Sequence, residues 1–329
     1  MLENKLFPNT EIENRQILQG DVLENLNKLP SGHYNCIITS PPYGGAIRDY
    51  AIDGQWGLEK DPFVYLDRLR NLMDKLWRVL RKDGIAWINI GDSIVKEGWF
   101  GFPERFFVNC LDAGWKSVTK PIWFKRNAMP LSTKKRFSPK YEPIYGFAKS
   151  DDYYFNLDEV RVPVLTEVKQ SFNFRVREGK KDRLAKKYGK YQYTATNKEK
   201  DSHDNLGVKK QNSTLGGDGK PKGHYEGFNG RYDHEKVSAN GKNPGDIFDI
   251  TVKPFKGAHF ATFPVEIPEL FIRCSCPENG WVLDPFFGSG TVGLVAEQLN
   301  RNWTGIELKH TYIEIAKDRI SKNTGVNFE

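Results

Sequence analysis

The sequence predicts an α/β fold in which a mostly parallel sheet carries helices on both faces, and three observations support this. Short apolar runs typical of buried strands alternate with segments of helical periodicity near both ends of the chain. A glycine-rich turn joins one strand to a helix, as in parallel sheets that bind ligands at their carboxyl edge. The region from about 151 to 246 is rich in Gly, Lys, Asn and Tyr and lacks this alternation, which indicates an insertion.

Seven predicted elements occupy the first 150 residues. Asp61 followed by Pro62 is a typical helix start, because aspartate caps the first amides and proline fits the first helical position. Gly114 follows a periodic apolar segment and predicts a helix end, and Asp83-Gly84 predicts a turn. In order, we expect a strand over 16–19, a helix over 22–29, a strand over 35–39, a helix over 62–82, a strand over 85–90, a helix over 102–113 and a strand over 117–124.

The alternation returns after the insertion. We expect a helix over 264–275, a strand over 281–283, a helix over 291–299, a strand over 302–306 and a helix over 310–320. Residues 1–150 and 258–329 are therefore predicted to build one α/β domain from two separated stretches, with residues 151–257 inserted between them.

The composition is that of a soluble globular protein, with 38% hydrophobic and 28% charged residues. No apolar stretch approaches the roughly 20 residues of a membrane helix, and the first residues lack the features of a secretory signal, so we expect a cytoplasmic location and no membrane partner. The four cysteines are too scattered for a disulfide framework or a zinc site. We expect reduced structural thiols and no metal.

The net charge of +7 is concentrated in one segment. Residues 175–242 contain 17 Lys and Arg against 9 Asp and Glu, whereas the rest of the chain is nearly neutral. Aromatic residues lie between these cations. This pattern suits a surface that contacts a polyanion, although a run of charges is also common on ordinary solvated surface.

A candidate ligand site follows the strand at 281–283, in the stretch Asp284 to Thr291. Gly288 and Gly290 remove side chains where a ligand would approach, and the helix that follows presents unpaired N–H groups. Glu307 ends the next strand, where a carboxylate can accept both hydroxyls of a ribose. This pairing suits either a nicotinamide dinucleotide or S-adenosylmethionine, and spacing alone does not separate them.

A second candidate site, Ser40-Pro41-Pro42-Tyr43, closes the strand at 35–39. The prolines hold this segment extended and supply carbonyls without competing N–H donors. The Ser40 hydroxyl and the Pro41 carbonyl could accept both hydrogens of an amine whose lone pair is delocalised into a ring, which would favour a pyramidal nitrogen. Tyr43 could stack on that ring. The alternative is a structural loop whose tyrosine packs on the core.

These two segments resemble motifs of one family. Thr39 to Tyr43 is similar to the catalytic motif of the exocyclic amino DNA methyltransferases, and Asp284 to Thr291 is similar to their S-adenosylmethionine motif. The order of the motifs is that of the circularly permuted β group. The resemblance implies a Rossmann-like methyltransferase fold with a catalytic half over 1–150, a target-recognition insertion over 151–257 and a cofactor-binding half over 258–329.

Two further segments extend the resemblance. The stretch 258–264 is similar to the family segment that holds the methionine end of the cofactor, and Asp21 matches a position that contacts its adenine. The implied catalytic residues are Ser40, Pro41, Pro42 and Tyr43. The implied residues for S-adenosylmethionine are Asp21, Phe260, Thr262, Asp284, Phe286, Gly288, Ser289, Gly290, Thr291 and Glu307.

The resemblance implies a site-specific enzyme that methylates a flipped-out base in double-stranded DNA, as part of a restriction-modification system with a cognate restriction endonuclease. Serine rather than aspartate at position 40 favours the N4 amino group of cytosine, with adenine N6 as the alternative. A nicotinamide-dependent oxidoreductase and a non-catalytic DNA-binding protein stay open as other classes, and the chain could be a monomer or a homodimer.

DNA contacts are expected in two places. The first follows the strand that reaches Phe124, in a region that lies near the flipped base in the family; an exposed basic loop is the alternative there. The second is the basic insertion. The expected DNA-binding residues are Lys125, Arg126, Asn127, Arg175, Arg177, Lys180, Lys181, Arg183, Lys209 and Lys210.

Overall fold

The computed structural model describes residues 12–45, 49, 51–95, 98–128, 132, 134–163, 241–252 and 263–328. The chain divides into two compact units, one of residues 1–161 with 243–329 and the other of residues 162–242. In the second unit the described residues are those at its two ends, where Val162 and Lys242 form an antiparallel bridge.

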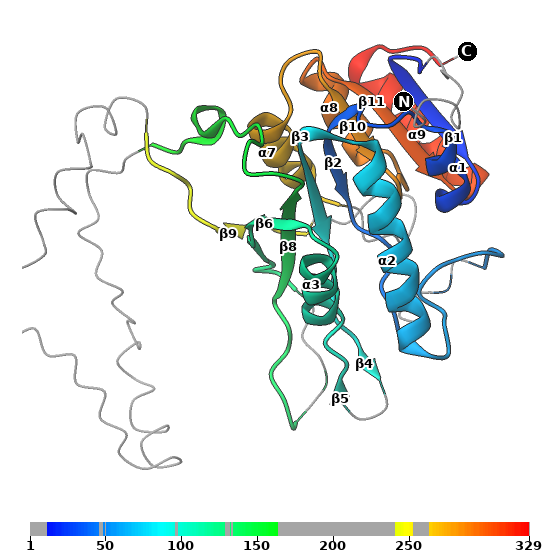
Figure 1. The fold of residues 1–329 in the computed structure, drawn as a ribbon, viewed down its shortest axis with the longest axis vertical. Helices are drawn as coiled ribbons and strands as arrows, with labels where there is room; N and C mark the ends of the chain where they lie inside the picture. Colours follow the sequence, from blue (N-terminus) through cyan, green and yellow to red (C-terminus); the bar gives the residue numbers. More distant parts are fainter. Residues whose placement is uncertain are drawn as a thin grey trace, which may run out of the picture. The chain divides into compact units, whose positions relative to one another are not determined.

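The first unit is built on one mixed sheet, whose strands interleave the two ends of the chain (Figure 1). Five neighbouring strands are parallel, and the others extend the sheet beyond β3, where β8 runs antiparallel to it. The prediction of a mostly parallel sheet is confirmed. The order is β1 (Arg15–Gln19), β11 (Asn302–Glu307), β10 (Trp281–Asp284), β2 (Tyr34–Thr39), β3 (Leu80–Asn89), β8 (Tyr141–Ala148), β7 (Ile122–Phe124) and β9 (Ile247–Asp249), with β6 (Lys116–Thr119) also paired to β8.

Helices cover both faces of this sheet, as predicted, because successive residues of each strand point to opposite faces. In β2, Ile37 joins the core that α1, α2 and α3 cover, whereas Cys36 and Ile38 join the core that α7, α8 and α9 cover. Outside these layers lie a short hairpin of β4 (Ile94–Val95) with β5 (Gly98–Trp99), and the 3-10 turn η1 (Leu157–Val160). The helices are α1 (Val22–Lys28), α2 (Pro62–Val79), α3 (Phe102–Asp112), α7 (Glu266–Ser275), α8 (Thr291–Gln298) and α9 (His310–Thr324).

The starts of α1 and α2 follow their local signals. Asp61 caps α2 by accepting a hydrogen bond of 2.9 Å from the Phe63 amide, and Asp21 caps α1 in the same way. The four cysteines are buried free thiols, as predicted. In the described part of the chain, no helix combines the length and the apolar character needed to cross a membrane.

Two boundaries differ from the prediction. The turn expected at Asp83-Gly84 is wrong, since α2 ends at Val79 and β3 begins at once with Leu80. A Cβ on Gly84 would lie 2.8 Å from the carbonyl oxygen of Asn35 on β2, so this glycine permits close strand contact instead of a turn. The single strand expected over 117–124 is two strands, because Pro121 cannot donate to the ladder.

The residues that precede and follow the second unit in the chain belong to the first unit and pack with its sheet. Residues 151–161 include η1, whose Val160 belongs to the core under α7. Residues 243–252 include β9, which pairs with β7. The part of the predicted insertion that forms a unit of its own is thus 162–242.

Candidate active site

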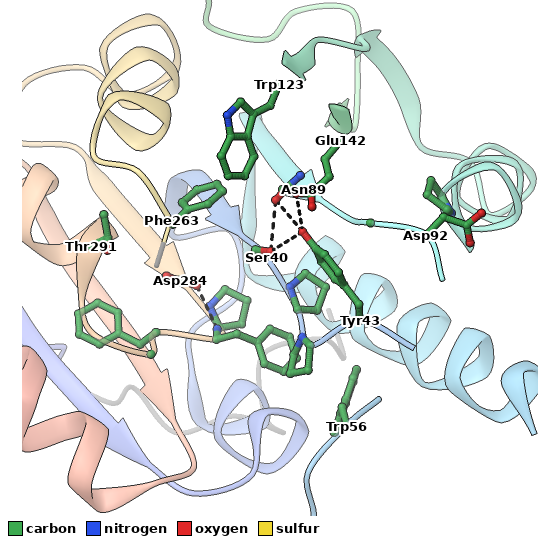
Figure 2. Close-up of a pocket in the computed structure, with 18 of the residues that line it drawn as sticks. Ser40, Tyr43, Trp56, Asn89, Asp92, Trp123, Glu142, Phe263, Asp284 and Thr291 are labelled. Carbon is green, nitrogen blue, oxygen red and sulfur yellow. Dashed lines mark hydrogen bonds between the residues drawn. The ribbon is translucent and has the colours of Figure 1, made fainter. Parts of the chain in front are cut away.

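A large cavity opens at the carboxyl ends of β1, β2, β3, β10 and β11, with a volume of about 1340 Å³ (Figure 2). This exceeds the roughly 300–1,000 Å³ of an ordinary small-molecule site, so two ligands could share it. Both motifs of the sequence line it. The lining includes Ser40, Pro41, Pro42 and Tyr43 together with Asp21, Asp284, Phe286, Gly288, Ser289, Thr291 and Glu307.

The glycine turn forms one end of this cavity. Gly288 and Gly290 have left-handed φ values of 52° and 75°. A Cβ on Gly288 would meet nothing closer than 4.0 Å, which leaves open space for a ligand beside the backbone. Gly290 does not line the cavity. A Cβ there would lie 2.8 Å from that of Ala316, so this glycine lets α8 begin against α9.

Asp284 joins the two motifs directly. Its carboxylate accepts a hydrogen bond of 2.7 Å from the Thr39 hydroxyl, one residue before Ser40, and another of 3.0 Å from the Phe286 amide. The carboxylate is buried, and burial raises its pKa to about 7, although both hydrogen bonds act in the opposite direction.

Glu307 ends β11 and is held by backbone amides. Its two oxygens accept hydrogen bonds from the Gly288 amide at 2.7 Å and from the Lys309 amide at 2.8 Å. Burial raises the pKa of this carboxyl above its ordinary value, and the hydrogen bonds partly offset that. Asp21 lines the same end, because Gln19 on β1 pairs with Glu307 in the parallel ladder.

Arg319 on α9 is a residue of this end that sequence reasoning missed. Its guanidinium donates to the Ser289 carbonyl at 3.2 Å, to the Ser289 hydroxyl at 3.1 Å and to the Thr291 hydroxyl at 2.8 Å. It therefore braces the turn from outside the motif. No pattern near residue 319 signals this contact, which depends on how α9 packs beside α8.

The other end of the cavity is a cluster of side chains around Ser40 (Figure 2). The Ser40 hydroxyl lies 3.3 Å from the Tyr43 hydroxyl and 3.3 Å from Asn89 Oδ1. Asn89 is the last residue of β3, and its amide nitrogen donates to the Pro143 carbonyl at 3.1 Å, which fixes the side-chain oxygen toward Ser40. We call Ser40, Tyr43, Asn89, Glu142 and Lys125 the acceptor cluster.

Glu142 on β8 holds the hydroxyl of Tyr43 at 2.8 Å and forms an ion pair with Lys125. The Lys125 ammonium also lies 4.1 Å from the ring centre of Trp123. The pKa of Tyr43 is raised well above its ordinary value, first by burial and then by the Glu142 charge. Its hydroxyl therefore stays protonated and can donate at neutral pH.

The ring of Tyr43 packs against the backbone that continues from β3. A Cβ on Gly91 would lie 2.5 Å from Tyr43 Cε2, so the glycine is needed for this close approach. The Pro42 carbonyl accepts a hydrogen bond of 2.7 Å from the Tyr65 hydroxyl on α2. The Ser-Pro-Pro-Tyr segment is thus anchored from two elements.

The predicted DNA-binding residues fall into two groups. Lys125 lines the cavity, Arg126 pairs with Asp249, and Asn127 exchanges two hydrogen bonds of 2.7 and 2.9 Å with the Val252 backbone. These three are tied to the body of the first unit. The seven predicted in the insertion, from Arg175 to Lys210, lie outside the described residues, as do Phe260 and Thr262.

Sequence reasoning also missed Asn89 and Glu142. Asn89 carried a usable signal, because it ends a long apolar strand and therefore lies at the carboxyl edge of a parallel sheet. Glu142 carried none. It lies near the start of an antiparallel strand, where an exposed carboxylate would be unremarkable.

Comparison with known proteins identifies relatives of this chain. The N6 and N4 family described as DNA methylase matches residues 34–318. The type II methyltransferase M.Cfr9I of Citrobacter freundii is 31% identical over 94% of this chain and 89% of its own length.

Two solved structures share the fold. The PvuII DNA methyltransferase, described as cytosine-N4-specific, superposes with a TM-score of 0.60 at 18% identity, over 94% of this chain and 92% of its own. The TTHA0409 protein of Thermus thermophilus, solved in complex with S-adenosyl-L-methionine, superposes with a TM-score of 0.55 at 21% identity, over 94% of this chain and 96% of its own.

Proposed function

Because the chain belongs to the DNA methylase family and is thereby a DNA methyltransferase, we propose that it moves a methyl group from S-adenosylmethionine to the N4 amino group of a cytosine. The base would be flipped out of a specific duplex sequence. M.Cfr9I is a type II methyltransferase, and we assign this chain the same role, as the modification half of a restriction-modification system. The oxidoreductase and non-catalytic alternatives do not fit that family.

One observation carries the proposal. Ser40 and the glycine turn, 248 residues apart at Gly288, line the same cavity, and the Thr39 to Asp284 hydrogen bond joins their strands. A base amine held at Ser40 and a methyl donor held at the turn would therefore face each other within one cavity. Alignment of two such reactants is by itself a large part of catalysis of a transfer reaction.

The glycine-turn end fits S-adenosylmethionine. The open space at Gly288 would admit the ligand beside the backbone, and the Glu307 carboxylate has the chemistry to accept the hydroxyls of an unphosphorylated ribose. Asp21 would accept from the adenine amine, and Phe286 supplies an apolar wall. When bound, the cofactor supplies a methyl group on a positively charged sulfonium.

The acceptor cluster would hold the amine that receives this methyl group. We assign the Ser40 hydroxyl and the Pro41 carbonyl as acceptors of its two hydrogens, with Asn89 Oδ1 fixing the serine. Tyr43 would contact the face of the base, while its hydroxyl stays bound to Glu142. Pro41 and Pro42 offer carbonyl acceptors but no backbone N–H donors, because proline has no N–H.

Lys125, together with the basic residues predicted between Arg175 and Lys210, would contact DNA phosphates near the target. Arg126 and Asn127 would act there from positions held by Asp249 and Val252. If several cations neutralise phosphates, the affinity for DNA falls steeply with salt, with a slope on the log–log plot of about −0.9 per contact. An affinity for DNA that does not change with salt would show that these residues do not contact phosphates.

Nucleoside analysis tests the proposed base. DNA incubated with the protein and labelled S-adenosylmethionine is digested, and N4-methylcytosine is separated from N6-methyladenine by mass and retention. We expect N4-methylcytosine, because serine stands at position 40 where aspartate would favour adenine. Label found only in N6-methyladenine would show that the target base is adenine and not cytosine.

Single-molecule sequencing of DNA from a host that expresses the chain tests the type II role, since it reports the modified base and its surrounding sequence together. We expect modification confined to one short sequence. DNA so modified should resist cleavage by a restriction endonuclease that reads the same sequence. Modification without a common sequence would contradict this assignment.

A further inference from the structure

The connection between β7 and β8 reaches the mouth of the cavity and is not explained by the function proposed above. Its described part near the mouth is 134–140, which leads into Tyr141. Phe137, Ser138, Pro139, Lys140 and Tyr141 all line the cavity together with Ser40. We call residues 134–141 the rim segment.

Phe137 makes the rim segment unusual. Its side chain is 97% exposed, the largest exposure among the large hydrophobic residues that the structure describes as exposed. Tyr141 is 59% exposed and Trp99, which also lines the cavity, is 45% exposed. Exposed aromatic rings that line a cavity are typical of a binding surface, because such rings are costly to leave in water.

The charge of the rim segment favours a polyanion as its partner. Lys134, Lys135, Arg136 and Lys140 are exposed, and no Asp or Glu occurs from 125 to 141. The two cations that precede the segment are already paired, Lys125 with Glu142 and Arg126 with Asp249. The rim segment therefore contributes four cations and no acidic residue.

Resting on the proposed function, we propose that the rim segment is a DNA-contacting element separate from the insertion, and that Phe137 enters the base stack where the target base has left it. A flipped base leaves a gap in the duplex, and unstacking costs free energy. An apolar ring that fills the gap offsets this cost. Phe137 lies at the mouth of the same cavity that would receive the base, and its neighbouring cations would contact the adjacent phosphates.

The test compares two duplexes that carry the recognition sequence found by sequencing. In one the target cytosine is paired, and in the other its partner nucleotide is abasic, so no pairing has to be broken. For Phe137→Ala we expect kcat/KM on the paired duplex to fall about tenfold, in line with the loss of one aromatic–base stack. On the unpaired duplex the two proteins should agree within about twofold, because the target base is already loosened.

Phe155→Ala is the matched control, since Phe155 is 39% exposed and does not line the cavity. It should behave as the unsubstituted protein on both duplexes. An equal loss on both duplexes, or no loss on either, would overturn the role of Phe137. If the unsubstituted protein transfers no methyl group to either duplex, it is the proposed function that fails, and not this inference.

The cations are tested separately by the salt dependence of DNA binding. The triple variant Lys134→Gln, Arg136→Gln, Lys140→Gln should bind more weakly, with a log–log slope less steep by about 0.9 for each lost phosphate contact. The control is Lys82→Gln, because Lys82 is exposed near the start of β3, about 23 Å of strand away from Asn89. An unchanged slope in the triple variant would remove the rim segment from the DNA interface.

Discussion

The two ends of the cavity are held together in different ways. At the glycine-turn end, the carboxylates of Asp284 and Glu307 accept hydrogen bonds from three backbone amides, those of Phe286, Gly288 and Lys309, and from one side chain, that of Thr39. At the other end, the acceptor cluster consists of side chains from β3 and β8 and from the residues that follow β2 and β7, and these side chains bind one another. One end is held mainly by backbone amides, and the other by side chains that converge from separate strands.

This difference predicts how each end responds to substitution. Backbone amides stay in place when a side chain changes, so damage at the glycine-turn end should be confined to the group that is altered. A side-chain network is coupled, because removing one member frees the others to move. Damage in the acceptor cluster should therefore spread through the cluster without reaching the donor site.

The largest expected effect is that of Glu307→Gln. The amide NH₂ of the new glutamine would face the N–H group of Gly288 or Lys309, and the site would lose a charged acceptor for the ribose hydroxyls. We expect the affinity for S-adenosylmethionine to fall about 100-fold by titration calorimetry, as for loss of a hydrogen bond to a charged group. Glu314→Gln on the exposed part of α9 is the control and should bind normally. An unchanged affinity in Glu307→Gln would remove Glu307 from the donor site.

Ser40→Ala should come next. It removes a proposed acceptor of the amine hydrogens, so kcat should fall about 30-fold. The affinity for S-adenosylmethionine should stay unchanged, because Ser40 belongs to the other end. A matching loss of affinity for S-adenosylmethionine would show that the two ends of the cavity are coupled.

Glu142→Gln and Tyr43→Phe test the coupling within the acceptor cluster. Glu142→Gln removes the charge that pairs with Lys125, and Tyr43→Phe removes the hydroxyl that Glu142 binds. Each should lower kcat about tenfold. The double variant should be little worse than the poorer single variant, because both changes break the same network. Losses that multiply would show two independent contributions and contradict the network.

The remaining expected effect is on stability and concerns Asp284. The native pKa of this carboxyl is raised to about 7 from 3.8, so between these pH values the folded protein binds more protons than the unfolded one. The free energy of unfolding should therefore decrease as pH rises from 5 to 7, and the contribution should level off above the native pKa.

Asp284→Asn keeps the oxygen that accepts from Thr39 and Phe286 but cannot ionise. Relative to this variant, the unsubstituted protein should lose up to about 1 kcal/mol of stability per pH unit in that range, measured by urea unfolding without cofactor. Parallel pH profiles for the two proteins would show that burial does not penalise the Asp284 charge.

Much of the fold could be predicted because its signals are local. The Asp61-Pro62 start of α2 needed only neighbouring residues, and the alternating strands and helices implied a parallel sheet. The prediction failed at Gly84, where a turn signal was outweighed by close contact with Asn35 on another strand. It also failed at Pro121, which divides an apolar run into two strands.

The two motifs, and hence the chemistry to look for, can be recognised from local sequence, because Ser-Pro-Pro-Tyr and the glycine turn owe their shapes to proline and glycine backbones. The roles of Asn89 and Glu142 beside Ser40, and of Arg319 behind the glycine turn, emerge only from the folded chain. These side chains act through partners that lie far away in the chain, such as Tyr43, 99 residues from Glu142, and Thr291, 28 residues from Arg319. Such contacts depend on strand order and helix packing, which no local pattern encodes.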